Sequence, residues 1–240
     1  MALIKSQMTK KKRKKKRSNE KTVKFTNTRV LLVGRKHDKE NIKEAKMKVI
    51  LFNGSRREKG CTYTALNLIA EELNKSGIET EFFFVGKRAV SGDIENLVKE
   101  AIEKIKEADG MVIGAPVYYA SPSGEMIAFL DRLYWQGEDF LRFKPAAAVT
   151  SARRAGTTAS LDVLNKYITY AQQPVITSRY WNMIHGSSPE EVLKDEEGVQ
   201  IMKTIGRNMA WILKSIEAGK KAGVEQPVAE KKLWTNFIRA

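Results

Sequence analysis

The residues best suited to bind an anion lie in one short stretch, between an apolar run over residues 49–52 and an amphipathic helix that Thr62 opens. In α/β proteins, phosphate sites are built where a strand is followed by a polar loop and then by the N-terminus of a helix. The amide groups of the first helical turn and the helix dipole favour a dianion there. Ser55 and Thr62 add hydroxyl donors, and Arg57 adds a positive charge. The sequence therefore predicts a phosphorylated ligand at this loop.

This loop matches neither of two common phosphate motifs. Five residues separate Gly54 from Gly60, and Cys61 and Thr62 follow, whereas a P-loop has four residues and then Lys and Ser or Thr. The dinucleotide pattern G-x-G-x-x-G is absent as well. Neither a nucleotide triphosphatase nor a Rossmann domain is predicted. The alternative is an ordinary strand-to-helix turn, although two hydroxyl donors and a guanidinium are more than a turn requires.

A second loop follows the third apolar run and carries aromatic residues. Pro116 restricts its backbone, and Tyr118 and Tyr119 offer flat amphipathic faces. Ser123 and Gly124 restart a helix. Taken alone, the two tyrosines are better explained by packing than by ligand contacts. Beside a phosphate loop, they favour a planar ring as the ligand.

A third loop, after the fourth apolar run, combines small residues with two arginines. It contains Ser151, Ala152, Arg153, Arg154 and Gly156. Small residues let the backbone approach a ligand. The guanidinium groups either stabilise an anion or lie in solvent. Thr157 or Thr158 is expected to cap the helix that follows.

The elements that must position these loops alternate along the chain. The expected strands are residues 49–52, 81–85, 110–115, 146–150 and 174–177. Helical apolar periods separate them, and Ser188, Pro189 and Glu191 mark a further helix start. The pattern predicts an α/β, doubly wound five-stranded parallel sheet of order 2-1-3-4-5 with helices on both faces. Strands one and three then flank the switch point where ligands bind, so the loops meet.

Charge divides the chain into two unequal parts. Residues 1–46 hold 17 basic and 4 acidic side chains, whereas residues 47–240 hold 26 and 24. Residues 10–17 are all basic, repel one another and cannot fold alone. This leader is a solvated tail, a nuclear-localisation-like patch or a binder of nucleic acid or anionic lipid. Nucleic acid is expected to contact the protein only there.

The remaining composition narrows the protein class. We expect translation to be able to start at Met47, with residues 1–46 dispensable, a domain over residues 47–223 and a tail over residues 224–240. One cysteine excludes a disulfide framework, and two histidines are too few for a Cys/His zinc site. No apolar run approaches about 18 residues, so no membrane contact is expected. We expect a cytoplasmic protein without a bound metal.

Three motifs together carry a resemblance to a known family. They are N-G-S-R-R-E-K-G-C-T, G-A-P-V-Y-Y-A-S-P-S-G followed by F-L-D-R, and S-A-R-R-A-G-T-T. Over about residues 47–223 the chain resembles the flavodoxin-like, FMN-dependent NAD(P)H oxidoreductases, relatives of NADPH-dependent FMN reductases and iron–sulfur flavoproteins. Many members carry a cysteine cluster after the second strand. This chain has none at residues 86–93, and its ligand count excludes an iron–sulfur centre.

The resemblance implies a role for each loop in binding FMN. The residues implied at the phosphate are Ser55, Arg57, Cys61 and Thr62, with Cys61 where many relatives carry Asn. Those implied along the isoalloxazine ring are Pro116, Val117, Tyr118 and Tyr119, with Ser123 and Gly124 completing that loop. Those implied at the pyrimidine edge are Ser151, Ala152, Arg153 and Gly156.

The implied reaction passes a hydride from NAD(P)H through FMN to a small acceptor, such as a quinone, flavin, nitro or azo compound. No catalytic side chain is required. A flavodoxin-type electron carrier without its own turnover is the alternative, although a body of net charge +2 lacks the acidic docking face usual in carriers. A basic-tailed binding module is a third possibility.

Two further expectations concern residues outside the three loops. Large aromatic residues in peripheral segments, namely Tyr134, Trp135, Trp234 and Phe237, indicate either packing within the domain or a homodimer interface. We expect a homodimer. His185 is interpreted as a loop residue rather than a proton donor.

Overall fold

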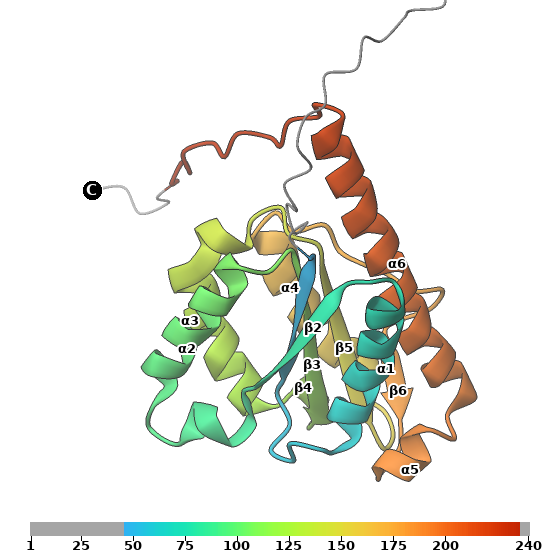
Figure 1. Cartoon of the computed structure of the whole chain (residues 1–240). Coiled ribbons are helices and arrows are strands. Elements are labelled where there is room, and N and C mark those ends of the chain that lie inside the picture. The colour runs from blue at the N-terminus through green and yellow to red at the C-terminus, as the bar shows by residue number, and fades with distance from the viewer. Residues whose placement is uncertain (1–45, 236–240) are drawn as a thin grey trace, which may run out of the picture. The chain divides into compact units, whose positions relative to one another are not determined.

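The computed structural model describes residues 46–235 and contains a parallel sheet with helices on both faces (Figure 1). Its parallel strands are β1 (Lys48–Asn53), β2 (Glu79–Phe84), β3 (Gly110–Tyr118), β5 (Ala146–Ala152) and β6 (Met183–His185). Their order is β2-β1-β3-β5-β6, and a two-residue strand, β4 (Ser121–Pro122), pairs antiparallel with β3. With β4 set aside, this order is the predicted 2-1-3-4-5.

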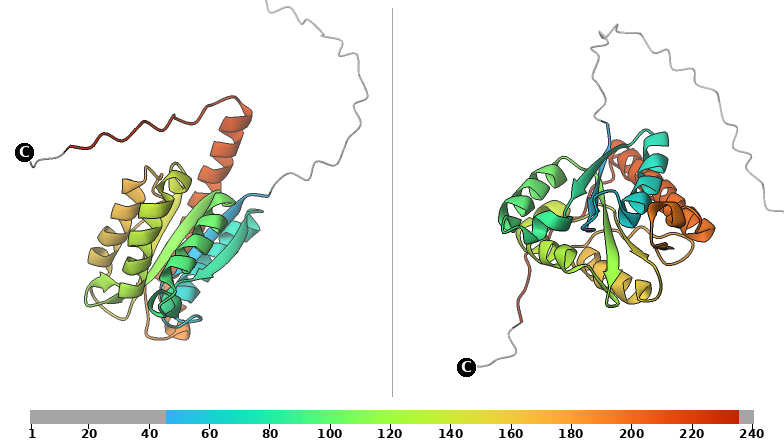
Figure 2. Two further views of the ribbon diagram at one scale, coloured as in Figure 1. Left: turned by 90° about the vertical axis from the view of Figure 1, so that its left-hand side faces the viewer. Right: turned by 90° about the horizontal axis from the view of Figure 1, so that it is seen from below.

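The long helices divide between the two faces of the sheet. They are α1 (Cys61–Lys75), α2 (Ile94–Lys106), α3 (Gly124–Leu141), α4 (Thr157–Tyr170) and α6 (Glu196–Lys221). The views of Figure 2 show α2, α3 and α4 on one face and α1 with α6 on the other. Two short helices, η1 (Gly86–Val90) and α5 (Pro189–Val192), lie in connections. None of the described helices is both long and apolar enough to cross a bilayer.

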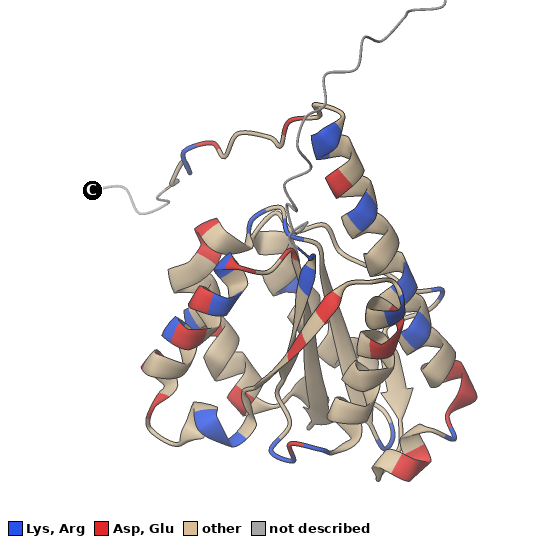
Figure 3. Ribbon diagram, viewed as in Figure 1, with Lys and Arg blue, Asp and Glu red and all other residues tan. Residues whose placement is uncertain are grey.

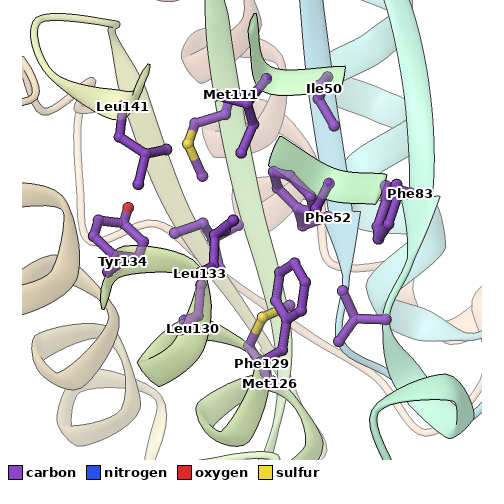
Figure 4. Packing of buried hydrophobic residues seen from close by; sticks show 14 of the residues in the cluster. Ile50, Phe52, Phe83, Met111, Met126, Phe129, Leu130, Leu133, Tyr134 and Leu141 are labelled. Atoms are coloured by element: carbon purple, nitrogen blue, oxygen red, sulfur yellow. The ribbon is translucent and has the colours of Figure 1, made fainter. Parts of the chain in front are cut away.

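Each face of the sheet has its own hydrophobic core. Ile50 and Phe52 of β1 pack with residues of α2 and α3, and Val49 and Leu51 pack with residues of α1 and α6. Successive side chains of a strand point to opposite faces, so a strand covered on both faces must be apolar throughout. Figure 4 shows the first core, in which the Phe52 ring packs against the rings of Phe83 and Phe129.

The predicted fifth strand is wrong in its position. Residues 174–177 make only one bridge, between Val175 and Ala146, and the chain then leaves the sheet. The strand that pairs with β5 is β6, where Thr150 lies opposite Met183. Asn182 explains the detour, because its buried side-chain amide donates to the carbonyl oxygens of Ala148 and Ile176. His185 is accordingly the last residue of β6 rather than a loop residue.

The residues predicted to be peripheral aromatics differ in their surroundings. Tyr134 is 3% exposed, and its hydroxyl donates to Gln173 Oε1 at 2.8 Å, so it belongs to the core and not to a peripheral segment. Trp135, its neighbour, is 79% exposed. The predicted leader, apart from Lys46, and Phe237 lie outside the described residues. Secondary structure runs from Lys48 to Lys221.

Replacing Phe52 with alanine should lower the free energy of unfolding by about 3–5 kcal/mol, because the cavity left beside the Phe83 and Phe129 rings cannot collapse fully. Urea denaturation followed by circular dichroism measures this loss. Val90→Ala, at a side chain that is 55% exposed, should change stability by about 0.5 kcal/mol or less. A loss for Phe52→Ala no larger than that of the control would contradict the packing.

Candidate functional site

The three loops singled out by the sequence meet at the carboxyl edge of the sheet, at the lower end of β1 and β3 in Figure 1. They enclose a cavity of about 300 Å³. Its lining residues are Ser55, Arg57, Cys61, Thr62, Pro116, Val117, Tyr118, Ser151, Ala152, Arg153, Gly186 and Ser187. The connections after β1 and β3 pass to opposite faces, which makes this the topological switch point of the sheet.

A buried asparagine shapes the loop after β1. Asn53 is 2% exposed, accepts a hydrogen bond from the Ser55 amide at 3.0 Å and donates to the Glu58 carbonyl oxygen at 2.8 Å. The Ser55 hydroxyl in turn accepts from the Arg57 amide at 3.1 Å. Both ends of the turn are therefore held by one side chain. The sequence interpretation assigned no role to Asn53, although a polar residue closing a buried strand is a usable signal.

The N-terminus of α1 is open toward the cavity. Its N-cap is Gly60, which has no side chain to satisfy the first-turn amide groups. Thr62 Oγ1 and Ser151 Oγ lie 2.8 Å apart, so the first and third loops are hydrogen-bonded to each other. A helix N-terminus with uncapped amides attracts an anion through both hydrogen bonding and the helix dipole. The local structure thus retains the anion-binding property that the sequence predicted.

Cys61 is the first residue of α1 and lies at the wall of the cavity. Its thiol donates to the Gly186 carbonyl oxygen at an Sγ···O distance of 3.6 Å. Burial raises the pKa of the Cys61 thiol, and the positive charge of Arg57 opposes this only in part. The thiol is therefore protonated at neutral pH and can coexist with a bound anion without repelling it.

The second loop is a β-hairpin rather than an open loop. Pro116, Val117 and Tyr118 are the last residues of β3 and line the cavity. Tyr119 and Ala120 form the two-residue turn to β4, with φ of 51° and 57°. Tyr119 is fully exposed and is not part of the cavity wall, so the two adjacent tyrosines have different surroundings.

Three other predicted residues lie behind the wall. The buried Ser123 hydroxyl donates to the Gly54 carbonyl oxygen at 2.9 Å, and Gly124 begins α3. Gly156 has φ of 101° and is itself the N-cap of α4; a Cβ there would lie 2.8 Å from Ala120 Cα. The expectation that Thr157 or Thr158 caps α4 is wrong. The Thr157 hydroxyl instead donates to Met183 Sδ at 3.2 Å.

Arginines and small groups form the far side of the cavity. Arg153 lines it and Arg154 follows; among the described residues neither forms an ion pair. Figure 3 shows basic segments in the loops at this edge, beside the acidic helix α5. Gly186 and Ser187 were missed by sequence reasoning because they follow β6, whose position was predicted wrongly.

A larger hollow of about 550 Å³ at the amino edge of the sheet offers a different environment. Its lining includes Lys106, Asp109, Phe140 and Lys220, near the C-termini of α2, α3 and α6. Helix C-termini present carbonyl oxygens and the negative end of the dipole, which disfavours an anion. Of the two hollows, only the cavity at the carboxyl edge combines a helix N-terminus with an aromatic wall.

The cavity is suited to binding and orienting a ligand rather than to acid–base chemistry. Cys61 is its only lining residue other than arginine and tyrosine that titrates, and its thiol is held neutral. The described residues contain no group of three or more His, Cys, Asp or Glu side chains placed to hold a metal ion.

Comparison with known sequences identifies relatives with flavin chemistry. Residues 47–187 match the family model described as NADPH-dependent FMN reductase. An iron–sulfur flavoprotein of Methanocaldococcus jannaschii is 30% identical over 200 residues, which cover 71% of this chain and all of the relative. An iron–sulfur flavoprotein of Archaeoglobus fulgidus is 27% identical over 196 residues, or 70% of this chain and 98% of the relative.

Solved structures share the fold at lower identity. The WrbA-like flavodoxin from Agrobacterium tumefaciens superposes with a TM-score of 0.56 at 14% identity, over 71% of this chain and 98% of its own. RosB with a bound 8-demethyl-8-formylriboflavin-5'-phosphate intermediate superposes with a TM-score of 0.59 at 16% identity. The match covers 80% of this chain and 92% of RosB. These likenesses confirm the predicted flavodoxin-like fold.

Ala120→Gly should raise the free energy of unfolding by about 0.5–1 kcal/mol, because only glycine adopts a left-handed backbone without steric cost. The matched control is Ala128→Gly in α3, where glycine should lower stability by about 1 kcal/mol. Urea denaturation of both variants gives the two signs. A destabilised Ala120→Gly protein would show that the turn is not strained.

Proposed function

The chain belongs to the NADPH-dependent FMN reductase family, and from this premise we propose that its carboxyl-edge cavity binds FMN. The protein then acts as an oxidoreductase that passes a hydride from NAD(P)H to a small acceptor such as a quinone, flavin, nitro or azo compound. One observation carries the proposal: an uncapped helix N-terminus and an aromatic strand end share one cavity at the switch point.

The residues present fit the chemistry of FMN. A phosphate needs donors, and Arg57, the amides of α1 and the hydroxyl of Ser55 or Thr62 supply them. A flat ring needs an apolar wall, which Pro116, Val117 and Tyr118 form. The cavity volume lies at the lower end of the range for small-molecule sites, in keeping with a ring that stays open on one side.

Bound FMN would supply the hydride-accepting and hydride-donating centre. The chain's part is to hold and polarise it. Arg57 and the α1 dipole would hold the phosphate end, while Val117 and Tyr118 would orient the ring plane. Arg153, at the far side of the cavity, would place a positive charge near the pyrimidine edge and so favour an anionic form of that edge.

An absorption spectrum of the purified protein, before and after anaerobic NADPH or NADH, tests the function directly. Flavin bands that bleach, together with steady-state oxidation of the nicotinamide by a soluble acceptor, support the oxidoreductase. Bands without turnover favour the electron carrier. Protein that neither contains nor binds FMN would overturn the proposal.

The double variant Arg57→Ala, Thr62→Ala should bind FMN about 100-fold more weakly while remaining folded, because it loses a charged donor and a hydroxyl at the phosphate end. Quenching of FMN fluorescence on titration measures the affinity. Lys59→Ala is the matched control, since Lys59 is an exposed cation of the same loop outside the cavity wall. Equal affinities for both variants would refute the phosphate assignment.

We also propose that two copies of the chain pair through α3 and α4. Between these helices lies a groove of about 390 Å³ that is lined mainly by aromatic and aliphatic side chains. Trp135, 79% exposed, and Tyr170, 51% exposed, are part of it. The surface formed by α3 and α4 can pack against the same surface of a second copy across a two-fold axis. This packing would bury the exposed aromatic side chains of both copies.

Light scattering coupled to size exclusion should give the mass of a dimer for the native chain and of a monomer for Trp135→Lys. Trp211→Lys is the control, because Trp211 is 67% exposed on α6, which lies on the other face of the sheet. A monomeric native chain would refute the pairing.

A further inference from the structure

We propose that Glu125 is a positioning residue for the phosphate end of the site, and that it acts by pairing with Arg56 and so anchoring the loop that carries Arg57. The inference rests on the proposed function, since it concerns how the FMN phosphate is bound. It follows from a contact that neither the motifs nor the cavity wall include. The Arg56 Nε and Glu125 Oε1 atoms lie 2.7 Å apart and join the first loop to the first turn of α3.

The burial of Glu125 makes this contact significant. Its carboxylate is 10% exposed, whereas the Arg56 side chain is 59% exposed. A buried carboxylate is costly unless it is paired, and Arg56 is its one ion-pair partner among residues 46–235. The position of Glu125 in the first turn of α3 also favours a negative charge there. The carboxylate is thus fixed by the helix, and the exposed arginine is drawn to it.

Neighbouring contacts hold the same end of the loop. Gly54 donates its amide to the Gly114 carbonyl oxygen at 2.8 Å and accepts from the Ser123 hydroxyl at 2.9 Å. A Cβ on Gly54 would lie 2.7 Å from Met126 Cε, so α3 packs directly on this backbone. Residues 123–126 therefore hold the loop at Gly54, just before Arg56. The ion pair adds a second point of attachment to α3 two residues later, at Arg56.

The loop carries two consecutive arginines, and the ion pair with Glu125 fixes which of them faces the cavity. Arg57 lines the cavity and Arg56 does not. Without the Glu125 charge, Arg56 loses its partner on α3, and the backbone beside Arg57 is held only through Asn53 and the Ser55 hydroxyl. Because the phosphate is the ligand group at this loop, the effect should fall on FMN and leave binding of the ring alone unchanged.

The test compares FMN with riboflavin, which has the same ring but no phosphate. Glu125→Gln should raise the dissociation constant for FMN about 10-fold and leave that for riboflavin unchanged, as fluorescence quenching measures. Arg56→Gln should reproduce this loss, and circular dichroism checks that the variant is folded, because it leaves the Glu125 carboxylate without its ion-pair partner. The double variant should lose no more than either single variant, because both remove one interaction.

Several outcomes would overturn the proposal. An equal loss of affinity for both ligands would show a merely structural role, and tighter FMN binding by Glu125→Gln would show that Arg56 competes for the phosphate. Glu58→Gln, an exposed carboxylate of the same loop, is the control and should change neither constant. Failure of the proposed function is distinct, since the native chain would then bind neither ligand.

Discussion

The strand β1 pairs in parallel with both β2 and β3, and this arrangement determines where the helices and the ligand site lie. Parallel strands require crossover connections, and these are right-handed, so the helix after β1 and the helix after β3 must lie on opposite faces. The two loops then separate at the carboxyl edge and leave a cavity that no side chain of the cores fills. The ligand site is therefore a consequence of the topology, and the loop residues determine only what it binds.

The cavity wall keeps its shape through polar contacts that cross between loops. Asn53 closes the first loop on itself, Thr62 meets Ser151 of the third, and Ser123 reaches the backbone of the first from α3. All four side chains are buried, so a lost partner would leave an unsatisfied polar group. Such contacts hold the loops in place without a ligand. That preorganisation lowers the entropic cost of ordering the loops when a ligand binds.

Local patterns predicted most of this arrangement, and the failures have identifiable causes. The apolar strand β1, the polar loop after it and the restart at Gly124 follow from periodicity and turn chemistry, which are local in sequence. The strand β6 has three residues, too few for a periodic signal, and its place depends on the long-range bonds of Asn182. Contacts between loops, such as Arg56 with Glu125, leave no sequence pattern at all because the residues are far apart in the chain.

One difference from the curated relatives has a direct physical consequence. Those in Methanocaldococcus jannaschii and Archaeoglobus fulgidus are named iron–sulfur flavoproteins, yet this chain has a single cysteine, which cannot bind such a cluster alone. The segment after β2 instead forms η1, which buries Ala89 in the core and places Arg88 over the Phe83 ring. Under the proposed function, electrons must therefore leave from the flavin itself.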